Sequence, residues 1–380
     1  MSQTSDHTTR EEDAACCVRK VVSRLQSSLS RNNAPKRVLP RVPQTSQDRR
    51  DVSLTETPLN AASLAQSDIR ASGEKQKTVL YLAYGSNLCN ETFRGVRGIR
   101  PLSQINVLVP SLRLTFDLPG LPYMEPCFAN SAVRDPESSA DYHKDRWHKG
   151  MVGCVYEVTM SDYANIIVTE GGGASYQDIL VDCYPLPDAD TVPSVPVTPA
   201  FKAHTLFAPA DSPTSSGAPH TTSRLSRPDP AYAQPSARYL KLLTDGAAEL
   251  SLPREYQTYL HGIRPYTITS KRQFVGKAVF MGMWMPFVLF LFALGKKLQD
   301  DQGRTPKWLG MLMGWVFMGM WTFYDAGFSR AFGDGERTEG DDDDNNVYRK
   351  GCRDEEVEST TGVGGVRVSE SVGRSEMDLV

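Results

Sequence analysis

One short segment of the sequence combines two tyrosines, a glycine and two polar residues at the end of an apolar run. Its members are Tyr81, Leu82, Ala83, Tyr84, Gly85, Ser86 and Asn87. A chain reversal at Gly85 exposes consecutive backbone N–H groups and a hydroxyl, which can hold a carboxylate or an amide without a cation. The alternative is an ordinary turn between a strand and a helix.

A second segment places a carboxylate, Glu170, directly before three glycines and after an apolar stretch. A carboxyl group that is partly removed from water has a raised pKa, which suits a general base near neutral pH. The glycines let the backbone pack closely around whatever this carboxylate contacts. The alternative is a solvated helix C-terminus that a glycine caps.

Composition and spacing disfavour several other kinds of chemistry. A net charge of −3 argues against nucleic-acid binding, which needs a positive excess. The 7 cysteines form no CxxC pair, which excludes a zinc ribbon and disfavours a disulfide framework. His143 and His148 lie in a polar loop without a cysteine, so we expect no metal there. Cys89 is either a redox-sensitive thiol or a buried, unreactive one.

Short apolar runs that are typical of buried strands must position these two segments. They cover residues 78–84, 105–109, 112–117, 153–158 and 178–184, and Pro, Gly or Asp bounds each of them. Residues 161–169 predict a short helix with Ser161 as its N-cap, ending just before Glu170. Strands and long helices do not alternate, so the sequence predicts an α+β fold rather than a doubly wound sheet.

Polar stretches flank and interrupt this pattern. Residues 1–77 contain no aromatic residue and predict a disordered tail, in which residues 14–31 could form a basic amphipathic helix, a presequence or a membrane-surface segment. A Pro/Ser-rich insertion covers residues 185–235, with one more strand expected at 202–208. Helices are expected at 236–243 and 253–263, and residues 329–380 predict a disordered acidic tail.

Two apolar runs near the C-terminus predict a pair of transmembrane helices within residues 274–328. Residues 278–295 carry no charge over 18 positions, and residues 308–323 contain one polar residue, Thr322. We expect Pro286 to kink the first helix, and Gly310 with Gly314 to let the two helices approach closely. The alternative is a buried helical hairpin in a soluble domain.

The turn at residues 84–88 and the Glu-Gly pair at 170–171 resemble the γ-glutamylcyclotransferase superfamily. A third stretch supports the resemblance, because Pro235-Ser236-Ala237-Arg238-Tyr239 and the residues that follow it to 263 are similar to that family's C-terminal helical region. The resemblance covers residues 78–266, about half of the chain. The apolar hairpin is not part of the core family.

The resemblance implies a small mixed β-barrel with flanking helices and an active site at one mouth. It implies that residues 81–87 bind the substrate, that Glu170 is the catalytic carboxylate and that Tyr176 and Tyr239 line the substrate pocket. It implies no metal and no other cofactor. The implied reaction closes a γ-glutamyl group to 5-oxoproline and releases the amine that it had acylated.

These observations leave two hypotheses for the function. The first is a membrane-tethered γ-glutamylcyclotransferase, acting on glutathione or a γ-glutamyl conjugate as its small-molecule substrate, with its catalytic domain facing the cytosol. The resemblance extends to fungal homologues that trim γ-glutamyl groups from glutathione adducts in sulfur-containing secondary metabolites. The second is an inactive, membrane-anchored binding or scaffold protein of the same fold. An unpaired carboxylate in a pocket, Glu170, argues against the second, because it lowers stability without another evident use.

Overall fold

The computed structural model describes residues 40–60, 77–135, 147–169, 177–207, 227, 229, 231–298 and 306–340. The chain divides into two units, Met1–Val42 and Pro43–Val380. All features below belong to the second unit.

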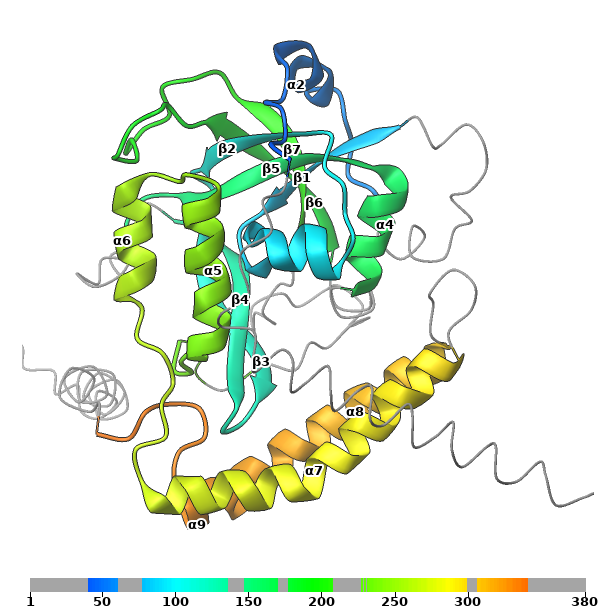
Figure 1. Cartoon of the computed structure of the whole chain (residues 1–380), viewed down its shortest axis with the longest axis vertical. Coiled ribbons are helices and arrows are strands. Elements are labelled where there is room, and N and C mark those ends of the chain that lie inside the picture. The colour runs from blue at the N-terminus through cyan, green and yellow to red at the C-terminus, as the bar shows by residue number, and fades with distance from the viewer. Residues whose placement is uncertain are drawn as a thin grey trace, which may run out of the picture. The chain divides into compact units, whose positions relative to one another are not determined.

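Five strands form a closed barrel (Figure 1). They are β1 (Thr78–Ala83), β2 (Ser103–Val109), β5 (Met151–Thr159), β6 (Gln177–Pro185) and β7 (Phe201–Phe207), in the order β1-β5-β2-β6-β7. Neighbouring strands are antiparallel except where the barrel closes, because β7 runs parallel to β1 at the pair Tyr81 and His204. The expected α+β fold with a small mixed barrel is confirmed.

Alternation along the strands separates an inner core from an outer one, because successive side chains point to opposite faces. Leu80 and Leu82 pack inside the barrel, whereas Tyr81 and Ala83 belong to the outer core under the helices. The inner cluster draws on all five strands: Leu80, Leu82, Ile105, Val107, Val109, Met151, Val155, Val181, Cys183, Phe201 and Ala203.

Beside the barrel, β3 (Leu112–Leu121) and β4 (Glu125–Val133) form a two-stranded antiparallel ribbon. The sequence predicted the first part of β3 but not β4. The register of the ribbon shifts between Thr115 and Leu118, so that two residues of β3 lie opposite the single residue Ala129 of β4. Such a β-bulge bends a ribbon and disrupts its ladder of hydrogen bonds locally.

Three helices cover the outer core: α4 (Met160–Thr169), α5 (Ala237–Glu249) and α6 (Arg254–Gly262). The Ser236 hydroxyl caps α5 by accepting the backbone N–H of Tyr239 at 3.0 Å. The predicted N-cap of α4 was wrong, because Ser161 lies inside that helix. Instead, the Thr159 hydroxyl accepts the N–H of Asp162 at 3.0 Å.

The prediction of a disordered tail over residues 1–77 is wrong for residues 43–60. This part contains the helix α2 (Gln47–Ser53) and is tied to the barrel by polar contacts. Arg49 pairs with Glu56 at 2.9 Å and donates to the Thr78 carbonyl at 3.1 Å. The Thr45 hydroxyl lies 3.0 Å from Ser103 Oγ. Hydrogen bonds and ion pairs therefore order a segment that has no aromatic residue to bury.

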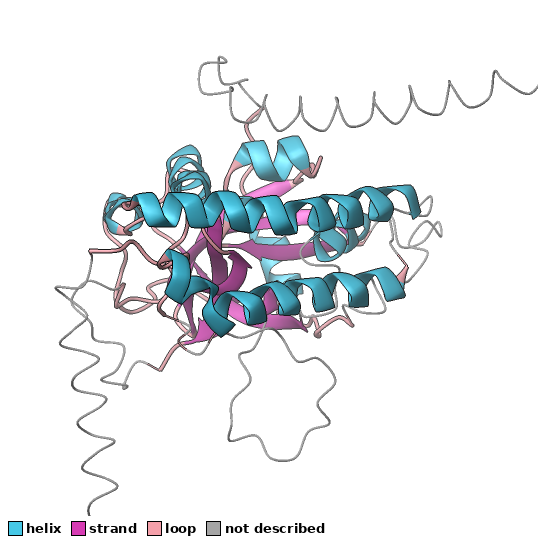
Figure 2. Ribbon diagram, turned by 90° about the horizontal axis from the view of Figure 1, so that it is seen from below, coloured by secondary structure: helices cyan, strands magenta, loops and turns pink. Residues whose placement is uncertain are grey.

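Two long helices, α7 (Lys271–Leu298) and α8 (Lys307–Phe323), run side by side in opposite directions (Figures 1 and 2). In the part of the chain that the structure describes, one helix, Lys271–Gly295 within α7, is long and apolar enough to cross a membrane. A core helix of a soluble protein can be as long and as apolar, but it is mostly buried. Only 22% of the most apolar 18-residue stretch of this helix is buried. With 17 residues, α8 falls short of that length, so the predicted transmembrane pair is not confirmed.

The contact between these helices differs from the predicted one. Among the described residues, no atom lies within 4 Å of a Cβ built on Gly310 or Gly314, so this glycine pair does not form the helix interface. Trp284 of α7 instead lies against α8, with its ring 6.1 Å from that of Phe323. Pro286 lies within the continuous helix α7.

The prediction of disorder over residues 329–380 is wrong for residues 329–340. A π-helical turn, η7 (Tyr324–Phe328), and the short helix α9 (Ser329–Phe332) extend α8. Beyond them, Glu336 and Thr338 are buried, and the Thr338 N–H donates to Gln234 Oε1 at 2.9 Å. Contacts with the body of the protein therefore order the start of this acidic segment. Residues 341–380 lie outside the described residues.

Candidate active site

The turn that follows β1 forms as its sequence predicted. β1 ends at Ala83, and a 3₁₀ turn, η3 (Ser86–Leu88), begins directly after Gly85. The Leu88 N–H donates to the Gly85 carbonyl at 3.0 Å and closes this turn. The N–H groups at the start of a helical turn have no acceptor within it, so they point towards any ligand placed there.

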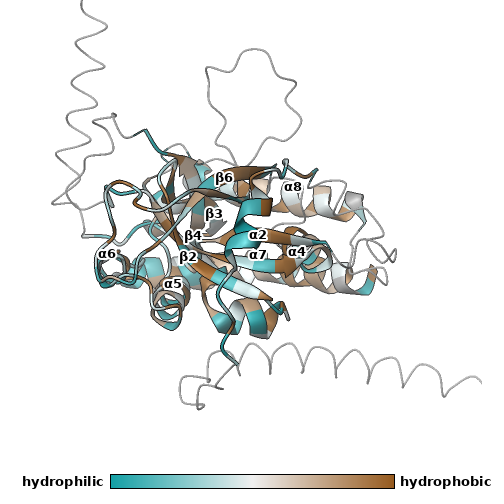
Figure 3. Ribbon diagram, turned by 90° about the horizontal axis from the view of Figure 1, so that it is seen from above, coloured by the Kyte–Doolittle hydropathy of each residue, from teal (hydrophilic) through white to brown (hydrophobic). Residues whose placement is uncertain are grey.

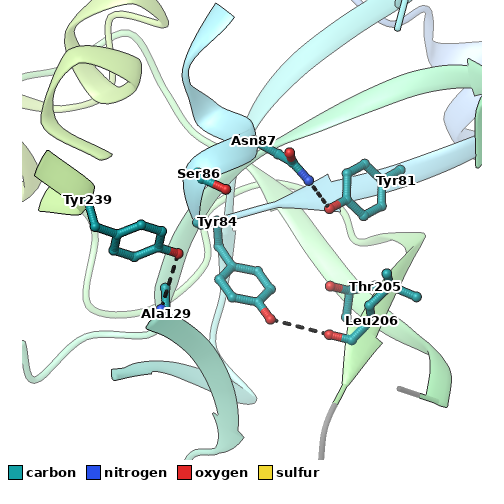
Figure 4. A pocket seen from close by; sticks show the side chains of 9 residues that line it. Tyr81, Tyr84, Ser86, Asn87, Ala129, Thr205, Leu206 and Tyr239 are labelled. Carbon is teal, nitrogen blue, oxygen red and sulfur yellow. Dashed lines mark hydrogen bonds between the residues drawn. The ribbon is translucent and has the colours of Figure 1, made fainter. Parts of the chain in front are cut away.

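A narrow cavity of about 40 Å³ lies at this turn (Figure 4). It is lined by Tyr81, Tyr84, Gly85, Ser86, Asn87, Ala129, Thr205, Leu206 and Tyr239. Six of these are predicted site residues, brought together from β1, the turn and α5. The other three come from β4 and β7. Because β1 and β7 are parallel where they meet, their C-terminal ends lie together at the cavity.

Three hydrogen bonds fix the side chains of the cavity (Figure 4). The Tyr84 hydroxyl donates to the Leu206 carbonyl at 3.3 Å. The Asn87 side-chain amide donates to the Tyr81 hydroxyl at 2.9 Å. The Ala129 N–H donates to the Tyr239 hydroxyl at 3.2 Å. Each bond joins two parts of the cavity wall, so the tyrosine rings are held by defined partners rather than by packing alone.

The Ala129 N–H is available for Tyr239 because of the β-bulge in the ribbon. Ala129 has no directly opposed partner on β3, since the register shift passes over it. The backbone group that would otherwise join the ladder donates to Tyr239 instead. Bulges often occur next to active sites, where they redirect a backbone group or a side chain. A bulge register is set by the folded ribbon, and no motif in residues 125–133 signalled it.

Gly85 lies across the narrow cavity from Tyr239 and Ala129. A Cβ at position 85 would stand 3.4 Å from Tyr239 Oη and 3.5 Å from Ala129 Cβ. These are ordinary contact distances, so a methyl group would fit without a clash. It would fill the gap between the turn and the opposite wall. The glycine therefore keeps space open for a ligand rather than relieving backbone strain.

Two predicted substrate-binding residues do not line the cavity with their side chains. Leu82 packs inside the barrel, and Ala83 belongs to the outer core. Alternation along β1 explains Leu82, which faces the opposite side of the strand from Tyr81. Ala83 faces the same side as Tyr81 but packs within the outer core. The Leu82 backbone still contributes indirectly, since its carbonyl accepts the Thr205 hydroxyl at 3.3 Å.

The described lining of the cavity carries hydroxyl, amide and apolar groups but no carboxylate or imidazole. The two predicted site residues Glu170 and Tyr176 lie outside the described residues. Their segment joins α4 to β6, which begins at Gln177 opposite Phe207, and Phe207 directly follows the cavity residue Leu206.

A buried ionic cluster lies on β7 next to the cavity. His204 contacts Asp178 at 2.8 Å through Nδ1 and Glu56 at 3.2 Å through Nε2, and Tyr163 also donates to Asp178. Burial lowers the pKa of His204, but hydrogen bonds to the two carboxylates outweigh it and raise this pKa to about 9. At neutral pH the imidazole is therefore charged, and it joins α2's flanking segment to the barrel.

Neither metal nor thiol chemistry has a described candidate here. Among the described residues, no group of three His, Cys, Asp or Glu side chains could hold a metal ion. His143 lies outside those residues, and His148 is exposed, with its backbone carbonyl accepting a hydrogen bond from Arg134 at 2.7 Å. Cys89 is buried, and burial raises the pKa of its thiol, which favours the unreactive alternative over a redox-sensitive one.

Comparison with known proteins gives one matching family model and several similar proteins. The AclK C-terminal domain family matches residues 270–331, which cover α7, α8 and most of α9. The γ-glutamyl cyclotransferase gliK of Aspergillus fumigatus is 32% identical over 264 residues, 68% of this chain and 89% of the relative. The γ-glutamyl cyclotransferase aclK of Aspergillus oryzae is 29% identical over 272 residues, 69% of this chain and 92% of the relative.

Among solved structures, one of a γ-glutamyl cyclotransferase is 20% identical, with a TM-score of 0.35. The alignment covers 51% of this chain and 93% of that one.

Proposed function

Because this chain belongs to the γ-glutamyl cyclotransferase family, we propose that it closes a γ-glutamyl group to 5-oxoproline and releases the attached amine. One observation carries the proposal. The turn at Gly85 and the helix α5 meet in one cavity, with Tyr239 across from the glycine. These are the two described regions to which the family resemblance assigns substrate binding.

The reaction makes three demands on the protein. The α-amine of the glutamyl group must lose a proton, the glutamyl chain must fold so that this amine reaches the γ-carbonyl, and the resulting oxyanion must be stabilised. Holding the amine close to the carbonyl can supply roughly 7–11 kcal/mol of the barrier. The ring nitrogen forms its bond to the γ-carbon while the bond to the leaving nitrogen breaks and that nitrogen gains a proton.

The cavity suits the second and third demands. Its hydroxyls and amide provide neutral partners for the carboxylate and the carbonyl of a folded glutamyl chain. The N–H groups that open η3 provide donors for the oxyanion. We assign the first demand to Glu170, because the described lining holds no carboxylate or imidazole and the segment of Glu170 leads into β6, whose first residue pairs with Phe207 next to the cavity residue Leu206.

The substrate that we propose is glutathione or a γ-glutamyl conjugate. Full-length protein in detergent should release 5-oxoproline from at least one member of a panel that contains glutathione, γ-glutamyl amino acids and glutathione S-conjugates. The Glu170→Gln variant should lose this activity, and Glu91→Gln, at an exposed position of the helical turn after η3, should retain it. Equal turnover in both variants would remove Glu170 as the base, and absence of 5-oxoproline from every substrate would refute the reaction.

Gly85→Ala tests the cavity itself. The added methyl group fits at contact distance from Tyr239 and Ala129, so we expect the variant to fold. The methyl group occupies the space between the two walls and so removes a few contacts with the ligand. KM for the γ-glutamyl substrate should therefore rise at least about tenfold. A variant with unchanged KM would show that the substrate binds elsewhere.

We also propose that α7 and α8 anchor the protein in an intracellular membrane, with the catalytic domain in the cytosol. Large apolar side chains remain exposed along both helices, and Figure 3 shows the apolar colouring of α8. Four described cysteines are free, which fits a reducing compartment. The protein should stay in the membrane pellet after a carbonate wash, and release into the supernatant would contradict an integral anchor.

A further inference from the structure

The tip of the β3–β4 ribbon packs against the helical hairpin, which consists of α7, α8 and the turn η7 that extends α8. Tyr123, at the turn between the two strands, is 1% exposed and has a φ of 63°. Its ring lies 5.8 Å from the rings of Phe280 and Tyr324 and 5.9 Å from that of Phe328. A bulky residue rarely adopts this left-handed conformation, and it persists only where its surroundings hold it in place.

Hydrogen bonds reinforce this aromatic contact. The Tyr123 N–H donates to the Gly335 carbonyl at 2.7 Å, and its hydroxyl donates to the Gly333 carbonyl at 2.7 Å. From α8, the indole N–H of Trp321 donates to the Gly120 carbonyl at 3.1 Å. A Cβ at Gly335 would stand 2.9 Å from the Tyr123 ring, so the chain after α9 lies directly against it. The hairpin and the segment after it therefore hold the ribbon tip on two sides.

The middle of β4 forms a wall of the cavity. Ala129 lies six residues beyond Tyr123 on β4, which corresponds to roughly 20 Å of extended chain. There its N–H donates to the Tyr239 hydroxyl, across the gap from Gly85. Between Tyr123 and Ala129, β4 is paired with β3 on one edge. This half of the ribbon thus runs from the hairpin to the cavity, where the β-bulge leaves the Ala129 N–H to Tyr239.

We propose that the helical hairpin supports the substrate pocket through this ribbon, in addition to any role as an anchor. Trp321 and Tyr123 are positioning residues. They fix the ribbon tip, and the ribbon then holds Ala129 and Tyr239 at the distance from Gly85 that a glutamyl chain needs. The part of this inference that concerns substrate rests on the proposed function, whereas the mechanical link between hairpin and ribbon does not.

The chain offers a matched pair of variants on one helix. Trp321→Phe removes the hydrogen bond to Gly120 but keeps an aromatic ring, and Trp321 is 1% exposed. Trp315→Phe makes the same chemical change at a position that is 77% exposed. Tyr123→Phe, which removes only the hydroxyl contact with Gly333, is a second and milder perturbation if Trp321→Phe does not fold.

Hydrogen exchange tests the link without reference to activity. In full-length protein in detergent, the amides of residues 125–133 should exchange faster in Trp321→Phe than in wild type, including the Ala129 amide bonded to Tyr239. Trp315→Phe should match wild type. Equal protection of residues 125–133 in all three proteins would overturn the inference, whatever the protein's activity.

Kinetics then test the effect on the pocket. Trp321→Phe should raise KM for the γ-glutamyl substrate by roughly two- to thirtyfold, the range of coupling between distant positions, with a smaller change in kcat. A purely structural role would lower the active fraction and hence the apparent kcat while KM stayed constant. Faster exchange with an unchanged KM would overturn the role in substrate binding. If wild type itself makes no 5-oxoproline, the proposed function fails, and the exchange result still decides the link.

Discussion

The packing of α5 against the turn η3 gives a sharp test of how the site is held. Gly246 lies in the buried face of α5, and a Cβ there would stand 2.5 Å from the carbonyl carbon of Leu88 and 2.6 Å from the Cys89 nitrogen. Both atoms are backbone and cannot rotate away. Gly246→Ala must therefore displace either the helix or the turn that carries Gly85.

The expected cost combines two opposing contributions. Overpacking of a rigid contact destabilises a protein by about 1–3 kcal/mol. Replacing a helical glycine by alanine stabilises it by up to about 1 kcal/mol. Gly262→Ala is the matched control, because no described atom lies within 4 Å of a Cβ at that position in α6. It gains the second contribution alone, so the free energies of unfolding of the two variants should differ by about 1–3 kcal/mol.

Urea titration in detergent measures that difference, and the cyclotransferase assay adds a second readout. Gly246→Ala should lower kcat/KM even in its fully folded fraction, since the displaced turn carries the cavity wall. Gly262→Ala should leave kcat/KM unchanged. Equal stability and equal kcat/KM in the two variants would refute the argument that close packing of α5 positions the turn.

Two further predictions concern charge and capping. Burial lowers the pKa of His204, but its carboxylate partners outweigh burial and raise this pKa from 6.5 to about 9. The charged imidazole therefore stabilises the folded protein fully below pH 6.5, and this stabilisation is lost as the pH rises through 9. The free energy of unfolding should therefore fall by about 3 kcal/mol between these two pH values. Urea titrations at several pH values should show a flatter pH dependence in His204→Gln but not in His261→Gln, whose histidine is exposed. A pH dependence as steep in His204→Gln as in wild type would contradict the role of the His204 charge. Thr159→Ala should destabilise the protein by about 1 kcal/mol because it removes the cap on the Asp162 N–H, and an equal loss in Ser161→Ala would contradict this assignment of the cap.

Strands of the barrel were predictable where burial on both faces leaves a plain signal. β1, β2 and β5 carry runs of β-branched or aromatic residues, and the inner and outer cores use both faces of each. β6 was also predicted, although its apolar residues enter the inner core alone. β4 was missed because Pro126, Asn130 and Ser131 interrupt its apolar pattern. Its pairing with β3 and the burial of its polar residues come from tertiary contacts that no local pattern encodes.

The polar segment around α2 shows a second limit. A lack of aromatic residues correctly indicates that little apolar surface can be buried, but disorder does not follow where charges find partners. Arg49 contacts Glu56 just after α2, the Thr78 carbonyl on β1 and Glu157 on β5. Such a network depends on the position of the barrel, so a composition argument underestimated the order of this segment.

For the site, motif and resemblance identified the turn and Tyr239, whereas the opposite walls required the folded barrel. Thr205 and Leu206 reach the cavity because β7 closes onto β1, and the Thr205 hydroxyl donates to Leu82 across 123 positions of sequence. Ala129 reaches it because a bulge frees its N–H. Register decides both contacts, and a shift by one residue would turn each side chain to the opposite face.

The dependence on barrel closure separates the motif from the site that it serves. Tyr81 and His204 form the only registered pair between β1 and β7 among the described residues, so the parallel seam is short. The tie between the Tyr84 hydroxyl and the Leu206 carbonyl lies directly beyond that seam. A chain that kept residues 81–87 but lost the closing strand would keep the motif and lose the wall that faces it. The proposed activity of this chain therefore depends on the strand that closes the barrel as much as on the turn at Gly85.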